Sequence, residues 1–396
     1  MSIDPQNPGY IVCYDPATGQ LLSNIRAHTE QDVVEALKKA RNAQKKWAQT
    51  TFKERRKVLK IKSSEQVAWS LQYYSEIVKT CLISCGHDPD IVQFLCGFAD
   101  CGEALVKSGV DGITLIGSPQ VGRQVMSSSS TTLTPCTLEL GGKDCAILRQ
   151  DVNLRQIIPV ILRGVFQNAG QNCIGLERIL VHESIYDKFV KIIELRVREL
   201  RVGCALNDEE VSQGAKLLYG GHPFVHPLYP TAHYYTPTLL IDVTPDMPIS
   251  QTEHFGPIMV VMKFRTDDEA IEIANSSGYG LGNSVFTKDQ RKGEWMARRL
   301  RSGMVNINDF GASYLCNLPF GGVEGLRQQC LMKSITLDRF PWLIQTSIPK
   351  MLDYPVHFCG PMFVSNLVKT VYENRLLDKV KGIIKLIVKE RIDYEE

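Results

Sequence analysis

The chain has 396 residues, enough for two or three domains, and its 44% hydrophobic and 22% charged residues are typical of a globular protein with a buried core. Lys and Arg total 45 against 43 Asp and Glu, so the net charge of +2 provides no broad basic surface for a phosphate backbone. We therefore expect no nucleic-acid partner.

The first elements are expected before residue 61. Residues 10–22 combine an apolar run with Pro-Ala-Thr-Gly, which predicts a strand that enters a turn. From Thr29 through Lys60, apolar residues recur at helical spacing among many charges. This period predicts two amphipathic helices that face a core.

Strand and helix patterns alternate in the next part of the chain. The segments are a helix between Trp69 and Leu82, a strand, glycine-bounded loop and helix start over 109–126, two short strands over 134–149, and a mostly helical stretch over 153–202 with a break at Asn168–Cys173. The alternation predicts the fold class α/β with a largely parallel sheet.

The 12 cysteines are scattered over the chain, which favours reduced thiols over a disulfide framework. No CxxC pair with partnering His or Cys residues occurs, so we expect no metal site. No apolar run reaches the length of about 18 residues that a membrane helix needs, and the opening MSIDPQNPGY lacks a signal-peptide core. We expect a soluble, cytoplasmic chain.

One cysteine stands in a setting suited to chemistry. Cys173 lies in FQNAGQNCIG, where Gly170 and Gly175 permit a tight turn that could expose the thiol and direct backbone N–H groups at it. For a single cysteine, the role of a small core residue is roughly five times more frequent than that of a nucleophile. Cys173 is therefore a candidate only in combination with other motifs.

Two motifs supply that combination. GQNC at 170–173 and LELGGK at 138–143 resemble the nucleophile loop and the general-base motif of the aldehyde dehydrogenase superfamily. Glu139 precedes Cys173 by 34 positions (173 − 139), similar to the family's spacing between its catalytic Glu and Cys. Further matches follow in the family's order: KSSE at 62–65, IGSPQVG at 116–122, EHFGP at 253–257 and LPFGG at 318–322. Together these motifs are specific.

The resemblance runs from about Tyr10 to about Tyr354, and the runs HFGPIM, VNINDF and SIPKMLDYP are similar to the plant and fungal branch with a C-terminal extension, the plant family 22 type. It implies a Rossmann-type NAD-binding domain, incomplete here, an α/β catalytic domain and a C-terminal amphipathic helix. The implied boundaries are 1–139 for NAD binding, 140–325 for catalysis, 326–360 for a return segment and 361–396 for the extension. Members of the family form homo-oligomers, and their partners are small aldehyde substrates.

The resemblance also implies a mechanism. Cys173 would attack an aldehyde to form a thiohemiacetal, hydride transfer to the nicotinamide would leave a thioester, and Glu139 would activate the water that hydrolyses it to a carboxylic acid. A thiol hydrolase without cofactor is a second class of function, but the region between Glu139 and Cys173 contains no His to activate a thiol. A non-catalytic binding or membrane-surface protein is a third.

For the cofactor, the resemblance places ribose hydroxyl groups on Lys62, Glu65 and Glu253, and the nicotinamide ring beside Phe255. The remaining residues implied for cofactor contact are Gly117, Ser118, Gly122 and Leu140. A carboxylate at Glu65 accepts from a free 2′-hydroxyl and repels a 2′-phosphate, which favours NAD over NADP. Taken alone, the GSxxxG run is equally well explained as an ordinary strand-to-helix turn.

The chain departs from the family where a Trp-Asn pair should provide the second oxyanion donor. No such pair occurs, and RRKVLK at 55–60 leads directly into IKSSE, so the block with that pair, the first cofactor-binding strand and much of the oligomerisation hairpin is missing. Smaller gaps follow residues 210 and 322. We expect impaired catalysis and an exposed sheet edge. Omitted exons or a gene-model artefact explain these gaps better than a paralogue that lost the reaction.

Residues 363–388 repeat apolar side chains at helical spacing with lysines among them, which predicts a basic amphipathic helix. Such a helix packs on the protein body or lies on an anionic membrane surface. We favour packing by roughly two to one, because most amphipathic helices in soluble chains face a core. Association with the endoplasmic reticulum membrane is the alternative localisation.

Overall fold

The computed structural model describes residues 3–4, 7–16, 18–49, 65–200, 216–226, 230, 232–311, 320–323 and 343–346. By its internal contacts the chain divides into two units, residues 1–347 and 348–396, and all the described residues lie in the first. The predicted helix over 363–388 lies outside them. No helix in the described part is long and apolar enough to cross a bilayer.

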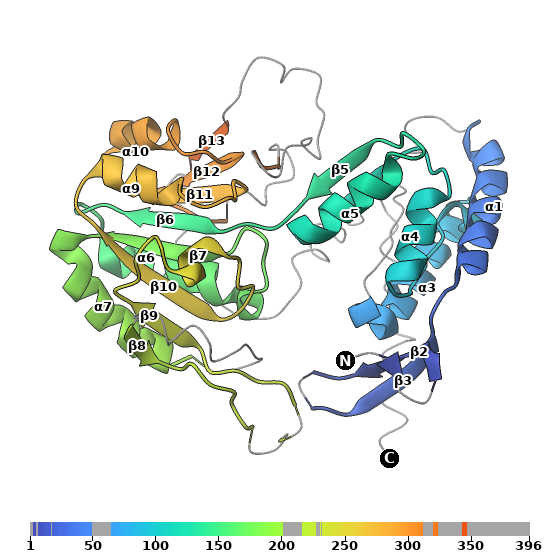
Figure 1. Cartoon of the computed structure of the whole chain (residues 1–396), viewed down its shortest axis with the longest axis horizontal. Helices are drawn as coiled ribbons and strands as arrows, with labels where there is room; N and C mark the ends of the chain where they lie inside the picture. Colours follow the sequence, from blue (N-terminus) through green and yellow to red (C-terminus); the bar gives the residue numbers. More distant parts are fainter. Residues whose placement is uncertain are drawn as a thin grey trace. The chain divides into compact units, whose positions relative to one another are not determined.

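An antiparallel sheet begins the chain (Figure 1). Its strands are β1 (Ile3–Asp4), β2 (Asn7–Tyr14) and β3 (Leu21–Arg26). The predicted strand and turn over 10–22 are confirmed, and the return strand β3 was not predicted. The first predicted helix is confirmed as α1 (Glu30–Trp47), which buries Val33 and Ala43. The second predicted helix would fall toward Lys60, and residues 50–60 lie outside the described residues.

A small α/β region follows. Its elements are the 3-10 turns η1 (Glu65–Val67) and η2 (Pro89–Ile91), the helices α3 (Ala68–Ser84), α4 (Ala99–Lys107) and α5 (Pro119–Ser129), and the strands β4 (Ile113–Ile116) and β5 (Cys136–Glu139). β4 and β5 pair in parallel. The helix predicted between Trp69 and Leu82 and the strand-loop-helix unit over 109–126 are therefore confirmed.

The largest element is an eight-stranded sheet (Figure 1). In spatial order its strands are β13 (Leu343–Thr346), β12 (Met304–Ile307), β11 (Gly282–Phe286), β6 (Asp144–Leu148), β7 (Leu176–His182), β10 (Ile258–Phe264), β9 (Thr238–Ile241) and β8 (Lys216–Tyr219). Every neighbouring pair is parallel except β8 with β9. The predicted largely parallel α/β sheet is confirmed.

Two cores cover the two faces of this sheet. α6 (Leu154–Phe166) and α7 (Glu183–Arg198) pack on the face that carries Ala146 and Leu148. α9 (Asp267–Ala274) and α10 (Gln290–Ala297) pack on the face that carries Cys145 and Ile147. Because successive strand residues point to opposite faces, β6 is buried throughout. The remaining short helices are η3 (Gln167–Gly170) and α8 (Pro248–Gln251).

The helical prediction for 153–202 is wrong at β7. Residues 176–181 are all buried, because β6 and β10 flank the strand and helices cover both of its faces. A strand buried on both sides shows no alternation, and a short apolar run cannot be distinguished from a buried helix by periodicity. α6 and α7 confirm the rest of that prediction.

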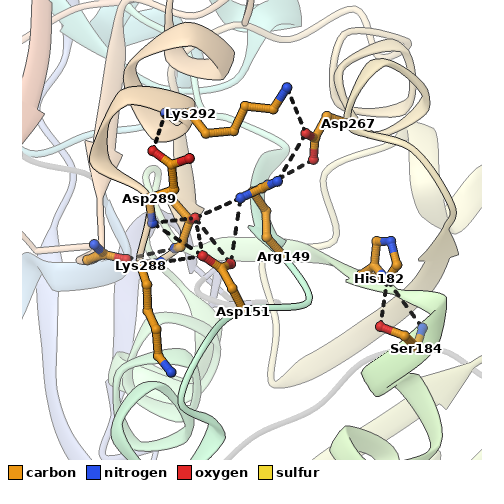
Figure 2. Close-up of polar contacts among 10 residues, drawn as sticks. Arg149, Asp151, His182, Ser184, Asp267, Lys288, Asp289 and Lys292 are labelled. Atoms are coloured by element: carbon orange, nitrogen blue, oxygen red, sulfur yellow. Dashed lines mark hydrogen bonds and ion pairs between the residues drawn. The ribbon is translucent and has the colours of Figure 1, made fainter.

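A polar network joins the carboxyl ends of β6 and β11 (Figure 2). Arg149 follows β6, and its guanidinium donates from Nε to Asp267 Oδ1 at 2.9 Å and from Nη1 to Thr287 Oγ1 at 3.0 Å. The Asp151 carboxylate accepts from the Thr287 hydroxyl and from the N–H groups of the next two residues. These contacts fix the loops after two central strands.

Candidate functional site

The loop that carries Cys173 is built on left-handed backbone. After α6, residues Asn168, Ala169 and Gly170 have φ values of 56°, 56° and 73°. A Cβ atom at Gly170 would collide with the carbonyl oxygen of Gly256, so this approach requires glycine. The predicted tight turn is present, and Cys173 is half-buried.

The Cys173 thiol lies beside the Glu139 carboxylate, and each group shifts the pKa of the other. Glu139 ends β5 and is 6% exposed. Burial raises the pKa of Glu139, although the thiol partly offsets this, and burial together with the Glu139 charge raises the pKa of Cys173. The predicted pair is therefore together in space, as a neutral thiol beside a carboxylate in a poorly solvated site.

The polar atoms around this pair are unevenly satisfied. Oε1 of Glu139 is buried and has no hydrogen-bond partner among the described residues. The Cys173 N–H likewise donates to no acceptor in the described ranges, whereas the Ile174 N–H donates to Asn172 Oδ1 at 3.4 Å. One carboxylate oxygen and one backbone donor are thus available beside the thiol.

The two glycines of LELGGK allow a close approach of three segments. A Cβ at Gly142 would lie 2.5 Å from the carbonyl oxygen of Cys173, and one at Gly141 would lie 2.5 Å from the Glu253 carboxylate. The Gly142 N–H donates to Glu253 Oε1 at 3.0 Å. Burial raises the pKa of Glu253 to about 7, against the effect of that hydrogen bond. Glu253 is therefore next to the backbone of the Glu139 motif.

The predicted cofactor residues of IGSPQVG gather at the start of α5. Ser118 caps this helix by accepting from the Val121 N–H at 3.3 Å, and the Gly117 N–H donates to the Glu139 carbonyl at 3.0 Å. A Cβ at Gly122 would lie 2.6 Å from the Leu140 side chain. The turn, the helix start and the end of β5 therefore form one tightly packed corner, suited to an anionic group.

The other implied cofactor residues are less fully described. Phe255 is half-exposed with φ of 49°, in line with a ring available to a ligand. Glu65 begins η1, but its side chain is not among those described, and Lys62 lies outside the described residues. In the described part of the chain β4 pairs only with β5, and Ile116 on it is 69% exposed. The expected exposed sheet edge is therefore present within the described residues.

A buried ionic cluster beside the site was missed. Lys143 Nζ donates to Glu177 Oε2 at 2.7 Å and to His254 Nδ1 at 2.9 Å, with the Lys143 and Glu177 side chains 0% and 5% exposed. Lys143 follows Glu139 by four positions, and Glu177 follows Cys173 by four. The sequence did contain a signal for this cluster, because a charged residue follows each catalytic candidate by four positions within an otherwise apolar run.

The Aldehyde dehydrogenase family model matches residues 3–61 and 59–325. The break between the two matched segments coincides with the position of the predicted missing block. A putative aldehyde dehydrogenase-like protein of Schizosaccharomyces pombe is 41% identical over 79% of this chain and 66% of its own length. One of Saccharomyces cerevisiae is 39% identical over 82% of this chain and 58% of its own length. The chain thus spans less than two thirds of the length of these relatives.

Solved structures show the same fold. HpcC of Thermus thermophilus aligns with a TM-score of 0.74 and 22% identity over 81% of this chain and 86% of its own. The NAD⁺ complex of an aldehyde dehydrogenase from Bacillus cereus aligns with a TM-score of 0.72 and 23% identity over 80% of this chain and 89% of its own. With a family match over most of its length, and internally shortened near residue 60, the chain belongs to the aldehyde dehydrogenase family.

Proposed function

We propose that this chain oxidises an aldehyde to a carboxylic acid with NAD as the hydride acceptor. The observation that carries the proposal is the placement of the Cys173 thiol beside the buried Glu139 carboxylate. The names of the relatives and the NAD⁺ complex among the solved structures support it.

Glu139 acts first on the thiol. Its pKa is raised by burial, which makes the carboxylate a stronger base than an exposed one, and it takes the proton of Cys173. The sulfur then forms a bond to the carbonyl carbon, and the π electrons move to the oxygen. The Cys173 N–H is the donor available to that oxyanion.

The residues around the pair fit the nicotinamide side of the cofactor. Glu253 could accept from ribose hydroxyl groups, Phe255 could flank the ring, and the start of α5 at Ser118 could receive the pyrophosphate. Bound NAD would supply the electrophilic carbon that accepts hydride from the thiohemiacetal carbon. Lys62 and Glu65 would hold the adenine ribose.

Glu139 then acts a second time. It first passes the proton taken from Cys173 to solvent, and its unpartnered Oε1 could then take a proton from water, whose oxygen adds to the thioester carbon. The C–S bond breaks, the carboxylic acid leaves, and Cys173 recovers its proton. Because the second oxyanion donor of the family is missing, we expect kcat to be lower by roughly two to three decades than with both donors.

The test is NADH absorbance after mixing the purified chain, NAD and a medium-chain aldehyde. We expect slow production, none with Cys173→Ala, and no more than one much slower turnover with Glu139→Gln, because Glu139 serves both the activation of the thiol and the hydrolysis. Cys81→Ala is the matched control, since Cys81 is exposed on α3. Equal rates for the wild type and Cys173→Ala would sink the proposal.

A second candidate is a catalytically inactive binding or membrane-surface protein of the same fold. The exposed edge of β4 favours it, because the family's first cofactor-binding strand is missing from the sequence. Residues 363–388 would provide the membrane contact. Silence in the NADH assay, together with sedimentation on acidic liposomes, would support this candidate, and the absence of liposome binding would remove its membrane part.

A further inference from the structure

The buried cluster of Lys143, Glu177 and His254 is connected to the site through backbone amides. Glu177 Oε1 accepts from the Phe255 N–H at 3.1 Å, and Oε2 accepts from the His254 N–H at 3.2 Å. One carboxylate therefore binds two successive amides of the segment that carries Glu253 and Phe255. A charged acceptor makes such hydrogen bonds strong.

The rest of the cluster holds that carboxylate in place. Lys143 donates to Glu177, and His254 accepts from Lys143 at Nδ1 while its Nε2 lies 3.1 Å from the Ile258 carbonyl. This pattern requires a neutral His254 that carries its proton on Nε2. The cluster thus contains one cation and one anion, with each group hydrogen-bonded.

The amides bound by Glu177 belong to strained backbone. Phe255 has φ of 49°, a left-handed conformation that is uncommon for a residue other than glycine. Such a conformation persists only where its surroundings hold it. On the other side, Glu253 is fixed by the Gly142 N–H. The segment is consequently held on both sides by the elements that also carry Glu139 and Cys173.

We propose that Glu177, held by Lys143, is a positioning residue that sets the Glu253 carboxylate and the Phe255 ring for the nicotinamide nucleotide. This inference rests on the proposed function, because the cofactor is what the two side chains would contact. It assigns the ionic cluster a task beyond stabilising the core. The two motifs with the catalytic candidates also supply the two charges that shape the cofactor side.

The test uses two double variants that keep the buried charge balanced. Lys143→Met with Glu177→Leu removes both amide acceptors, and Lys143→Met with Glu177→Gln restores one of them. Replacing a buried ion pair by neutral groups is often tolerated, so these variants are better suited than either single change. Glu272→Gln, at an exposed position of α9, is the matched control.

Two measurements are made on each full-length protein. Hydrogen exchange of the His254 and Phe255 amides reports how firmly Glu177 binds these two N–H groups. We expect their exchange to be at least about tenfold faster in the leucine variant, while the amides of β7 stay protected. NAD titration reports the consequence, and we expect a dissociation constant about tenfold higher in the leucine variant, partly recovered in the glutamine variant. The control should match the wild type in both.

The outcomes separate this inference from the proposed function. A wild type that binds no NAD overturns both. A wild type that binds NAD, with an unchanged dissociation constant in the leucine variant, overturns only the positioning role, even if exchange accelerates. If a double variant does not fold, hydrogen exchange and NAD titration on Glu177→Gln alone decide the question, with the same expected directions.

Discussion

The two ends of β6 carry ionic clusters of different character. At the amino end, Lys143 and Glu177 are almost completely buried. At the carboxyl end, the side chains of Arg149, Asp267 and Asp151 are 10%, 16% and 28% exposed. The difference teaches that burial alone does not mark a site. What distinguishes the amino end is that Glu177 binds the amides of His254 and Phe255, in the segment whose side chains are proposed to contact the cofactor.

The carboxyl-end cluster, in contrast, makes its ion pairs and hydrogen bonds among its own residues and the loop after β11. Arg149 and Lys292 both bind Asp267, and Asp151 accepts from three donors in the loop after β11. Its bonds link structural loops, and they lead to no residue of the proposed site. We therefore expect changes at this end to alter stability alone, whereas changes at the amino end should alter stability and cofactor binding.

The largest expected effect is that of Lys143→Met alone. The change leaves the Glu177 carboxylate buried without its cation, and we expect the free energy of unfolding to fall by about 3–5 kcal/mol. Denaturant unfolding measures it. Lys288→Met is the control, because Lys288 is exposed, and it should stay within about 0.5 kcal/mol of the wild type. A loss below about 1 kcal/mol would contradict the assignment of a buried pair.

A smaller effect is expected for Arg149→Met. It removes charged hydrogen bonds to Asp267 and Thr287, but Asp267 keeps Lys292 and some solvent contact and Thr287 keeps the Asp289 N–H. We therefore expect a loss of about 1–3 kcal/mol. NAD affinity should equal that of the wild type. If this variant weakened NAD binding as much as the Glu177 double variants, the contrast between the two ends of β6 would be wrong.

Much of the site could be predicted from the sequence, because its groups lie in short motifs. GQNC and LELGGK predicted Cys173 and Glu139 as a pair, which the structure brings together, and the spacing of IGSPQVG placed Gly117 and Ser118 at a helix start. These predictions depend on local chain geometry, which neighbouring residues determine. The exposed β4 edge could likewise be predicted from a missing block.

The rest depended on tertiary structure. A Lys and a Glu in separate motifs are ordinary surface residues by composition, and only the parallel pairing of β6 with β7 brings Lys143 to Glu177. β7 was assigned to a helix because its buried faces conceal the period of two. Long-range pairing and double-sided burial are properties of the sheet as a whole, and no single segment reports them.

The smallest expected effect is on how the free energy of unfolding depends on pH, which should have opposite signs for Glu253, near the amino end of β6, and Asp267, near its carboxyl end. Burial raises the pKa of Glu253 to about 7, so its contribution to stability is full below the unfolded pKa of about 4.3 and is lost as pH rises through about 7. Glu253→Gln removes this loss. Between pH 5 and pH 8 we expect the free energy of unfolding of the variant to rise by on the order of 1 kcal/mol relative to the wild type. The rise is this small because partial solvent contact weakens the effect.

Asp267 provides the opposite case. Burial alone would raise its pKa, but hydrogen bonds from Arg149 and Lys292 outweigh burial and hold the pKa below its ordinary value. Its contribution is present above about pH 4 and is lost only as pH falls further, so Asp267→Asn should change the slope of stability in acid and not between pH 5 and pH 8. Urea unfolding at a series of pH values distinguishes the two variants. Parallel pH profiles for Glu253→Gln and the wild type would show that the pKa of Glu253 is not raised.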